Sequence, residues 1–138
     1  MVAVQRLTVL YDGGCALCIR CRDFLAASAT LVPLELIACQ SQVARDRYGS
    51  VPWLGAELVV ADDQGRVWVG PAAFLMCLWA LRDYREWSYR LSGPLLAPLA
   101  ERFFSVLSAR RARIAALLAP RCDEAACHAD RRHAPLYR

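Results

Sequence analysis

Two cysteines separated by two residues, Cys15 and Cys18, are the side chains of this chain with the clearest chemical potential. A C-x-x-C pair can be oxidised to a disulfide and reduced again, it can bind zinc, or it can form an inert bridge. Residues 7–11, just before it, are apolar, β-branched and aromatic, which predicts a buried strand. Asp12 and two glycines then predict a tight turn. The pair therefore falls where a strand gives way to a helix, and this position favours the redox interpretation.

The start of a helix favours a thiolate, because its first backbone N–H groups lack partners within the helix and carry partial positive charge. We expect Cys15, nearer the helix start and more exposed, to be the nucleophile that forms a mixed disulfide. Cys18, one turn further on and buried beneath it, is expected to resolve that disulfide. Asp12 either accepts and returns the proton of Cys18 or holds the turn through a hydrogen bond to the backbone. Arg22 is either an ordinary solvated arginine or a group that helps to hold a thiolate.

Two further cysteines lie in segments with helical patterning. The core-facing stripe of the first predicted helix, residues 15–28, consists of Leu17, Cys21, Phe24, Leu25 and Ser28. We therefore expect Cys21 to be a small buried residue. The alternative is a third thiol close enough to Cys18 to intercept its disulfide. Cys77 falls inside a helix that is apolar nearly all round, and we expect it to be a packed thiol.

The last residues of the chain supply a second group of possible ligands, namely Cys122, Cys127, His128 and His133. If they folded back onto Cys15 and Cys18, the combined set could bind zinc. Cys122 and Cys127 could instead form a second redox pair that relays electrons to the first. A local structural disulfide or free thiols are the simpler interpretations of these two cysteines, and the sequence leaves all of them open.

Length and composition limit the possible classes of protein. The chain has 138 residues and a net charge of +4, and all 17 basic residues are arginine. We expect no nucleic-acid partner, because no basic strand with interleaved aromatic residues is present. We expect no stable membrane insertion, since the longest apolar run, residues 71–81, is too short to span a bilayer. The first residues do not resemble a signal peptide, so the expected location is the cytoplasm. No cofactor is expected.

The remaining patterns give the order strand, helix, strand, helix, hairpin, helix. The strands are expected over residues 7–11, 31–39, 57–61 and 66–69, the helices over residues 15–28, 40–48 and 72–84, and one or two more helices over residues 91–118. This is the element order of the thioredoxin fold, an α/β fold, with a four-stranded mixed sheet, flanking helices and a helical C-terminal extension. Leu99, Phe103, Val106 and Leu107 give the extension an amphipathic face, which we expect to pack onto the domain; binding to a membrane surface is the alternative. We expect one domain over residues 1–119 and a tail over residues 120–138.

Residues 11–18, with the sequence YDGGCALC, resemble the YDG-x-C-x-x-C signature of the DCC family of thiol-disulfide oxidoreductases. Residues 63–66 and 70–73 are similar to that family's turn and helix start. The resemblance implies a thioredoxin-like fold and exchange of the Cys15–Cys18 pair with a protein or a low-molecular-weight thiol or disulfide. Thioredoxins place a cis-proline directly before the third strand, whereas here Pro52 lies further upstream. A non-catalytic thioredoxin-like binding module is the remaining alternative, and the retained cysteine pair argues against it.

Overall fold

A computed structural model of the chain describes residues 3–49 and 57–118. Within these residues it contains four strands, β1 (Leu7–Tyr11), β2 (Leu34–Ala38), β3 (Val59–Asp62) and β4 (Val67–Val69), and six helices, α1 (Ala16–Ala27), α2 (Gln42–Tyr48), α3 (Pro71–Ala80), α4 (Arg85–Leu91), α5 (Ala97–Ala109) and α6 (Arg111–Leu118). The element order predicted from the sequence is confirmed, with α4 as an additional helix. Pro52 and the tail after residue 118 lie outside the described residues.

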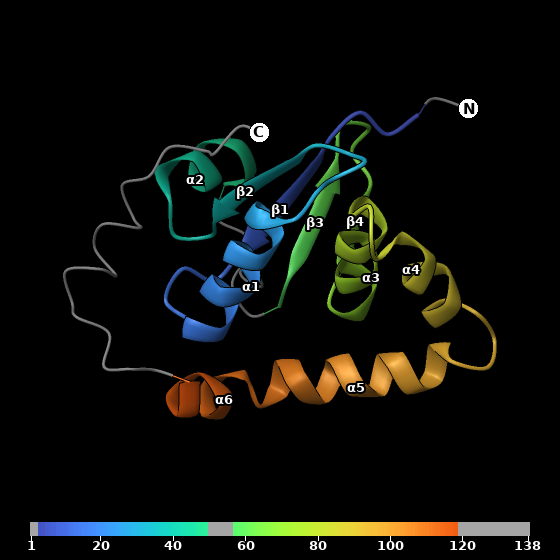
Figure 1. Ribbon diagram of the computed structural model, residues 1–138. Helices are drawn as coiled ribbons and strands as arrows, with labels where there is room; N and C mark the ends of the chain where they lie inside the picture. The colour runs from blue at the N-terminus through green and yellow to red at the C-terminus, as the bar shows by residue number, and fades with distance from the viewer. Residues whose placement is uncertain (1–2, 50–56, 119–138) are drawn as a thin grey trace.

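The four strands form one mixed sheet in the order β2-β1-β3-β4 (Figure 1). β1 runs parallel to β2, with Leu7 opposite Leu34, and antiparallel to β3, with Leu7 opposite Asp62. β3 and β4 form the antiparallel hairpin, and Gly65 in its turn has a φ of 83°, a conformation that glycine adopts at no steric cost. The fold is thus α/β and thioredoxin-like, with the expected four-stranded mixed sheet. The C-x-x-C pair follows its central strand β1.

Several element ends differ from the prediction because backbone groups find other partners. β2 begins at Leu34 rather than at residue 31, since the N–H groups of Leu31 and Val32 donate to the carbonyl oxygen of Ala80. α3 ends at Ala80 rather than near residue 84, because Leu81 is extended and pairs with Thr30. The N-terminus of α3 is as expected, with Pro71 in its first turn.

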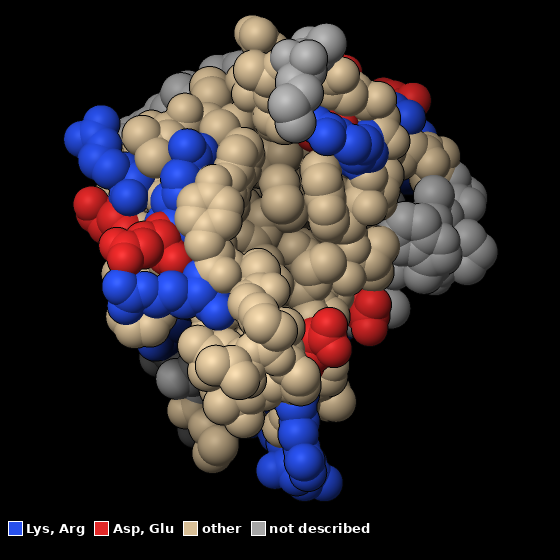
Figure 2. All heavy atoms as spheres, turned by 90° about the vertical axis from the view of Figure 1, so that its right-hand side faces the viewer, with Lys and Arg blue, Asp and Glu red and all other residues tan. Residues whose placement is uncertain are grey.

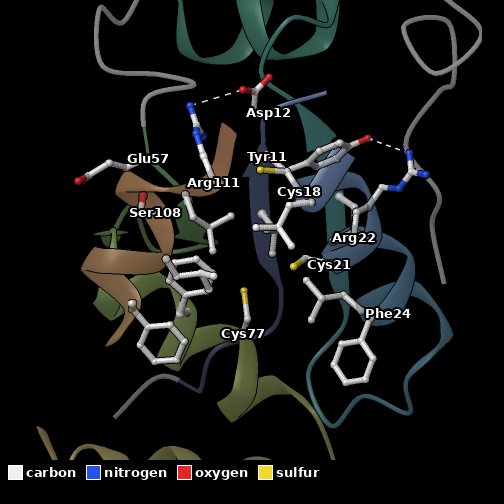
Figure 3. A pocket seen from close by; sticks show the side chains of 18 of the residues that line it. Tyr11, Asp12, Cys18, Cys21, Arg22, Phe24, Glu57, Cys77, Ser108 and Arg111 are labelled. Carbon is white, nitrogen blue, oxygen red and sulfur yellow. Dashed lines mark hydrogen bonds and ion pairs between the residues drawn. The ribbon is translucent and has the colours of Figure 1, made fainter. Parts of the chain in front are cut away.

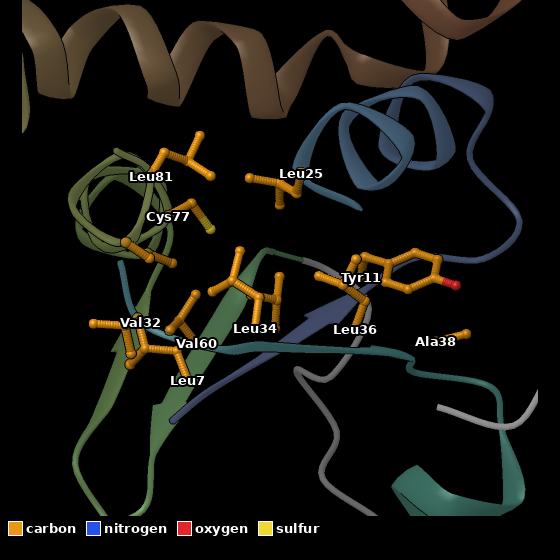
Figure 4. Packing of buried hydrophobic residues seen from close by; sticks show 13 residues of the cluster. Leu7, Tyr11, Leu25, Val32, Leu34, Leu36, Ala38, Val60, Cys77 and Leu81 are labelled. Atoms are coloured by element: carbon orange, nitrogen blue, oxygen red, sulfur yellow. The ribbon is translucent and has the colours of Figure 1, made fainter. Parts of the chain in front are cut away.

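Helices cover both faces of the sheet, so every residue of β1 is buried. On one face, Leu25 of α1 and Cys77 of α3 pack over Leu34, Leu36 and Val60 (Figure 4). The other face is covered by α2. Alternate residues along β1 and β2 therefore belong to two different clusters, and the C-x-x-C pair lies at one end of the larger cluster.

The face of the sheet under α2 contains a buried carboxylate. Glu35 on β2 is 1% exposed and lies 2.8 Å, Oε1 to Nη1, from Arg47 of α2. Thr8 of β1 donates to its Oε2 at 3.3 Å. At its other end α2 begins after Ser41, whose Oγ accepts the N–H of Ala44 at 3.2 Å. These contacts fix α2, and they also fix Gln40, which directly precedes its cap.

The C-terminal extension packs across α1 and α3. α5 lies against α3 and α6 lies against α1 (Figure 1). The face of α5 that packs contains Ala100, Phe104 and Leu107, and the Phe104 ring stacks on Phe74 with centroids 4.7 Å apart.

The expected packing of Leu99, Phe103 and Val106 was wrong, because these residues are 66%, 60% and 46% exposed. α5 is apolar on two sides, and the side that carries the small Ala100 is the one that fits against the domain. Figure 2, which views the molecule from the side of α4, shows charged side chains near the edges of a broad uncharged surface. In the described residues no helix is both long enough and apolar enough to cross a membrane.

Candidate active site

The turn before the C-x-x-C pair is held by two side chains that bind its backbone. Asp12 Oδ1 accepts a hydrogen bond from the N–H of Gly14 at 2.9 Å, which is the turn hydrogen bond that the sequence predicts as one of two roles for Asp12. The same oxygen accepts Nε2 of Gln40 at 2.7 Å, and Gln40 Oε1 accepts the N–H of Gly13 at 3.0 Å. A Cβ at Gly13 would lie 3.2 Å from both Ala38 Cβ and Gln40 Oε1, so a larger residue would push the two segments apart. The turn thus has little freedom, and it aims the next residue at the start of α1.

Cys15 occupies the N-cap position of α1. Its Sγ accepts the backbone N–H of Cys18 at 3.5 Å, so the sulfur is directed at the first turn of the helix. This N–H has no partner within the helix, and the hydrogen bond favours negative charge on the sulfur. The expectation that Cys15 is the more exposed of the two was wrong: the residue is 8% exposed, whereas Cys18 is half-buried. Cys15 is buried because the cap geometry turns its side chain inward over the helix end.

The thiol of Cys18 is held in its neutral form. Its pKa is raised from 9.0 to about 12, first by desolvation, then by the hydrogen bond with the Cys15 side chain and by the charge of Cys15. Asp12 raises this pKa further and Arg111 opposes the increase. At neutral pH Cys18 is therefore a proton donor toward the Cys15 sulfur. Cys15 Sγ thus accepts the backbone N–H of Cys18, while the Cys18 thiol keeps its proton.

Arg111, the first residue of α6, reaches the same site from the far end of the described chain. Its Nη2 lies 3.5 Å from Asp12 Oδ2, and both side chains are about four-fifths buried, with 24% and 20% exposed. The ion pair connects the helical extension to the turn. In the sequence Arg111 stands in a cluster with Arg110 and Arg113 and has no distinguishing pattern, so only the three-dimensional structure identifies it. Gln40 was missed for the same reason.

The other described cysteines surround the pair at different depths. Cys39 directly follows β2 and is buried, and its pKa is raised to about 11, first by burial and then by the charge of Asp12. Cys77 is buried as expected, and burial raises its pKa to about 12. The burial expected for Cys21 was wrong, because this residue is exposed. The packing of α1 is centred on Leu25, which leaves Cys21 at the border of that contact.

Arg22 contacts Tyr11 and Asp23. Its Nη1 donates to Tyr11 Oη at 3.2 Å, its guanidinium carbon lies 5.5 Å from the centre of the Tyr11 ring, and it pairs with Asp23. Arg22 therefore supports the buried Tyr11 at the end of β1.

The proton-acceptor role of Asp12 stays a prediction, as do the roles of Cys15 and Cys18.

The sequence matches a model of a known protein family. A family model described as DCC1-like thiol-disulfide oxidoreductase matches residues 9–117. The chain belongs to the DCC1-like thiol-disulfide oxidoreductase family. The resemblance found at residues 11–18 is thereby confirmed, and the match extends to Arg111 and α6. The chain matches no curated protein and no solved structure.

The zinc interpretation needs ligands that this DCC1-like protein would have to bring from its tail. In residues 3–49 and 57–118, no three or more His, Cys, Asp or Glu side chains are grouped so that they could hold a metal ion. Cys122, Cys127, His128 and His133, and with them the proposed second redox pair, lie outside the described residues.

A cavity of about 250 Å³ adjoins the C-x-x-C pair on the side of Cys18. Figure 3 shows Cys18 and Cys21 pointing into it from α1, with Cys77 below them on α3. The ion pair between Asp12 and Arg111 lies at its upper edge (Figure 3). In this member of the DCC1-like family, a cysteine pair whose first member is the N-cap of α1 therefore adjoins a cavity.

Proposed function

We propose that the protein catalyses thiol-disulfide exchange through Cys15 and Cys18, with a protein or a low-molecular-weight disulfide as its partner. The observation that supports this most directly is the contrast between the two sulfurs. Cys15 Sγ accepts a hydrogen bond from the backbone N–H of Cys18, while the pKa of the Cys18 thiol is raised to about 12. Membership of the DCC1-like family supports the same reaction class.

In the first step of this proposal the Cys15 thiolate attacks one sulfur of the partner disulfide. The partner's S–S bond breaks, its other sulfur leaves as a thiolate, and a mixed disulfide joins Cys15 to the partner. Cys18 then loses its proton and attacks Cys15 Sγ. The mixed disulfide breaks, the partner leaves as a second thiolate, and the Cys15–Cys18 disulfide remains. Two electrons have passed from the protein pair to the partner, and the reverse sequence oxidises the partner.

The second step needs an acceptor for the proton of Cys18. Asp12 is the carboxylate whose charge acts on Cys18, and its Oδ2 is directed at Arg111 rather than at the turn. We assign to Asp12 the task of taking this proton when the mixed disulfide has replaced the Cys15 thiolate. Arg111 pairs with Asp12 Oδ2 and keeps the acceptor in place.

Trapping of the mixed disulfide tests the assignment of the two cysteines. In Cys18→Ser, Cys15 can attack but nothing resolves the product, so a stable adduct with a protein or small disulfide should accumulate. Cys15→Ser should give no adduct, and Cys21→Ser serves as a matched control one helical turn away. Adducts in Cys15→Ser but not in Cys18→Ser would reverse the roles, and adducts in neither would overturn the proposed function.

A further inference from the structure

The cavity beside Cys18 lies between the domain and its own extension. Its walls come from β1, α1, α3, α5 and α6, and the apolar residues that define it include Leu17, Phe74, Leu78, Phe104 and Leu107. An apolar cavity of about 150 Å³ is enough to bind benzene. This one, at about 250 Å³, has room for an aromatic ring with a substituent.

The charged groups around the cavity favour an uncharged occupant. Arg111 faces the carboxylate of Asp12, and Arg22 pairs with Asp23. Glu57 adds a further carboxylate to the lining. An anionic ligand would have to compete with carboxylates that already hold both arginines, and burial in an apolar cavity would cost its charge solvation.

The same cavity is lined by thiols. Cys18 and Cys21 reach it from successive turns of α1, and Cys77 reaches it from α3 (Figure 3). Cys77 lies close enough for the charge of Cys21 to raise its pKa. The lining thus gives an apolar occupant direct access to one sulfur of the proposed redox pair, namely Cys18.

We propose that this cavity binds a small, uncharged, apolar thiol and presents its sulfur to Cys18, so that thiols of this class reduce the Cys15–Cys18 disulfide. This rests on the function proposed above and names the electron donor. A small molecule fits better than a protein, because residues of α5 and α6 form part of the cavity wall and a docking partner would meet these helices first.

The reduction balances with two molecules of the thiol. The first binds as the neutral thiol and loses its proton to solvent as its sulfur attacks Cys18 Sγ; the bond to Cys15 breaks, and Cys15 leaves as a thiolate that regains the hydrogen bond from the Cys18 N–H. The second thiolate attacks the sulfur of the bound molecule and releases Cys18, which takes up a proton. Two thiols become one apolar disulfide, and their two electrons enter the protein pair.

Rates of reduction of the oxidised full chain test this inference. Benzyl mercaptan carries an apolar ring, 4-(mercaptomethyl)benzoate carries the same ring with a negative charge, and 2-mercaptoethanol has neither ring nor charge. We expect benzyl mercaptan to react about tenfold faster than 2-mercaptoethanol after correction for thiolate fraction, as burial of a ring allows. Its rate should also saturate with concentration, and toluene should compete with it. The benzoate should show no such advantage.

Two tryptophan substitutions on α5 provide matched variants. Leu107→Trp places a larger side chain in the cavity and should reduce the ratio of the benzyl mercaptan rate to the 2-mercaptoethanol rate toward one. Leu99→Trp makes the same change on the exposed side of the helix, where Leu99 is 66% exposed, and should keep the ratio of the unsubstituted protein.

Equal corrected rates for benzyl mercaptan and 2-mercaptoethanol, no saturation, or no competition by toluene would overturn the inference, and these measurements need no variant to fold. An equal advantage for the benzoate would overturn the requirement for an uncharged ligand. If 2-mercaptoethanol reduces the pair and Cys18→Ser traps a partner, the proposed function stands without this site. If no Cys15–Cys18 disulfide can be formed, the proposed function itself fails.

Discussion

Replacement of Cys15 should make Cys18 more reactive toward alkylation. In the folded protein the pKa of Cys18 is raised from 9.0 to about 12, and two of the three leading causes, the hydrogen bond and the charge, come from the Cys15 side chain. At pH 7 a thiol with a pKa of about 12 is ionised to roughly one part in 10⁵, against about one part in 100 at a pKa of 9. In Cys15→Ser both contributions of the Cys15 side chain are gone, so the pKa of Cys18 falls toward 9.0.

The size of the effect has an upper and a lower bound. The full shift corresponds to about a thousandfold change in thiolate fraction, and desolvation, its largest cause, remains in the variant. We therefore expect the alkylation rate of Cys18 to rise by about tenfold or more, and by less than about a thousandfold.

Iodoacetamide labelling followed by peptide mass spectrometry measures this rate. Cys39 is an internal control, because its raised pKa comes from burial and from Asp12 rather than from Cys15. Its labelling should be the same in both proteins. An unchanged or slower rate at Cys18 in Cys15→Ser would refute the electrostatic coupling of the two sulfurs.

Three other substitutions are expected to act on separate parts of the site. Asp12→Asn should slow resolution of the mixed disulfide by about tenfold or more without unfolding the protein; in the same variant Cys39 should be alkylated faster, because the charge that raises its pKa is removed. If rapid quenching shows that the mixed disulfide resolves as fast as in the unsubstituted protein, Asp12 only holds the turn. Arg111→Gln removes both the ion pair with Asp12 and the positive charge that lowers the pKa of Cys18. Stopped-flow measurements should show slower resolution of the mixed disulfide, and loss of the partly buried pair should lower the free energy of unfolding by about 1 kcal/mol. An unchanged rate of resolution would show that α6 has no part in the reaction. Cys77→Ala should weaken the loss of stability at high pH. Burial raises the pKa of this thiol from 9.0 to about 12, so its contribution is complete below pH 9 and is lost as the pH rises toward 12. Between these values urea unfolding should show the unsubstituted protein losing about 1.4 kcal/mol per pH unit more than the variant, and parallel curves would contradict the assignment.

The local features of the site could be predicted because they depend on neighbouring residues. The strand at residues 7–11, the turn at Asp12 and the start of the helix after Cys15 follow from apolar patterning and from glycine and capping preferences. Ser41, the N-cap of α2, is a residue type that capping preferences place at such a position.

Contacts between distant segments could not be predicted. Arg111 meets Asp12 only because α5 and α6 fold back across α1 and α3. The sequence shows apolar residues on two sides of α5 but does not say which side packs, and the smaller Ala100 decides it. Cys21 was assigned to the core because it shares the apolar face of α1. Periodicity gives the direction of that face but not how far the contact with the core extends around the helix.

A redox titration of the full chain shows whether Cys15 and Cys18 form one redox pair. The protein is equilibrated with mixtures of reduced and oxidised dithiothreitol, and free thiols are alkylated. The mass of the peptide that contains Cys15 and Cys18 is then measured by mass spectrometry. We expect both thiols of this peptide to disappear together in one two-electron transition, in which the ratio of oxidised to reduced protein changes tenfold for about every 30 mV. Substitution of either cysteine should abolish the transition. Both thiols remaining free across the whole range, or a disulfide that joins one of them to another cysteine, would contradict the assignment of Cys15 and Cys18 as the redox pair.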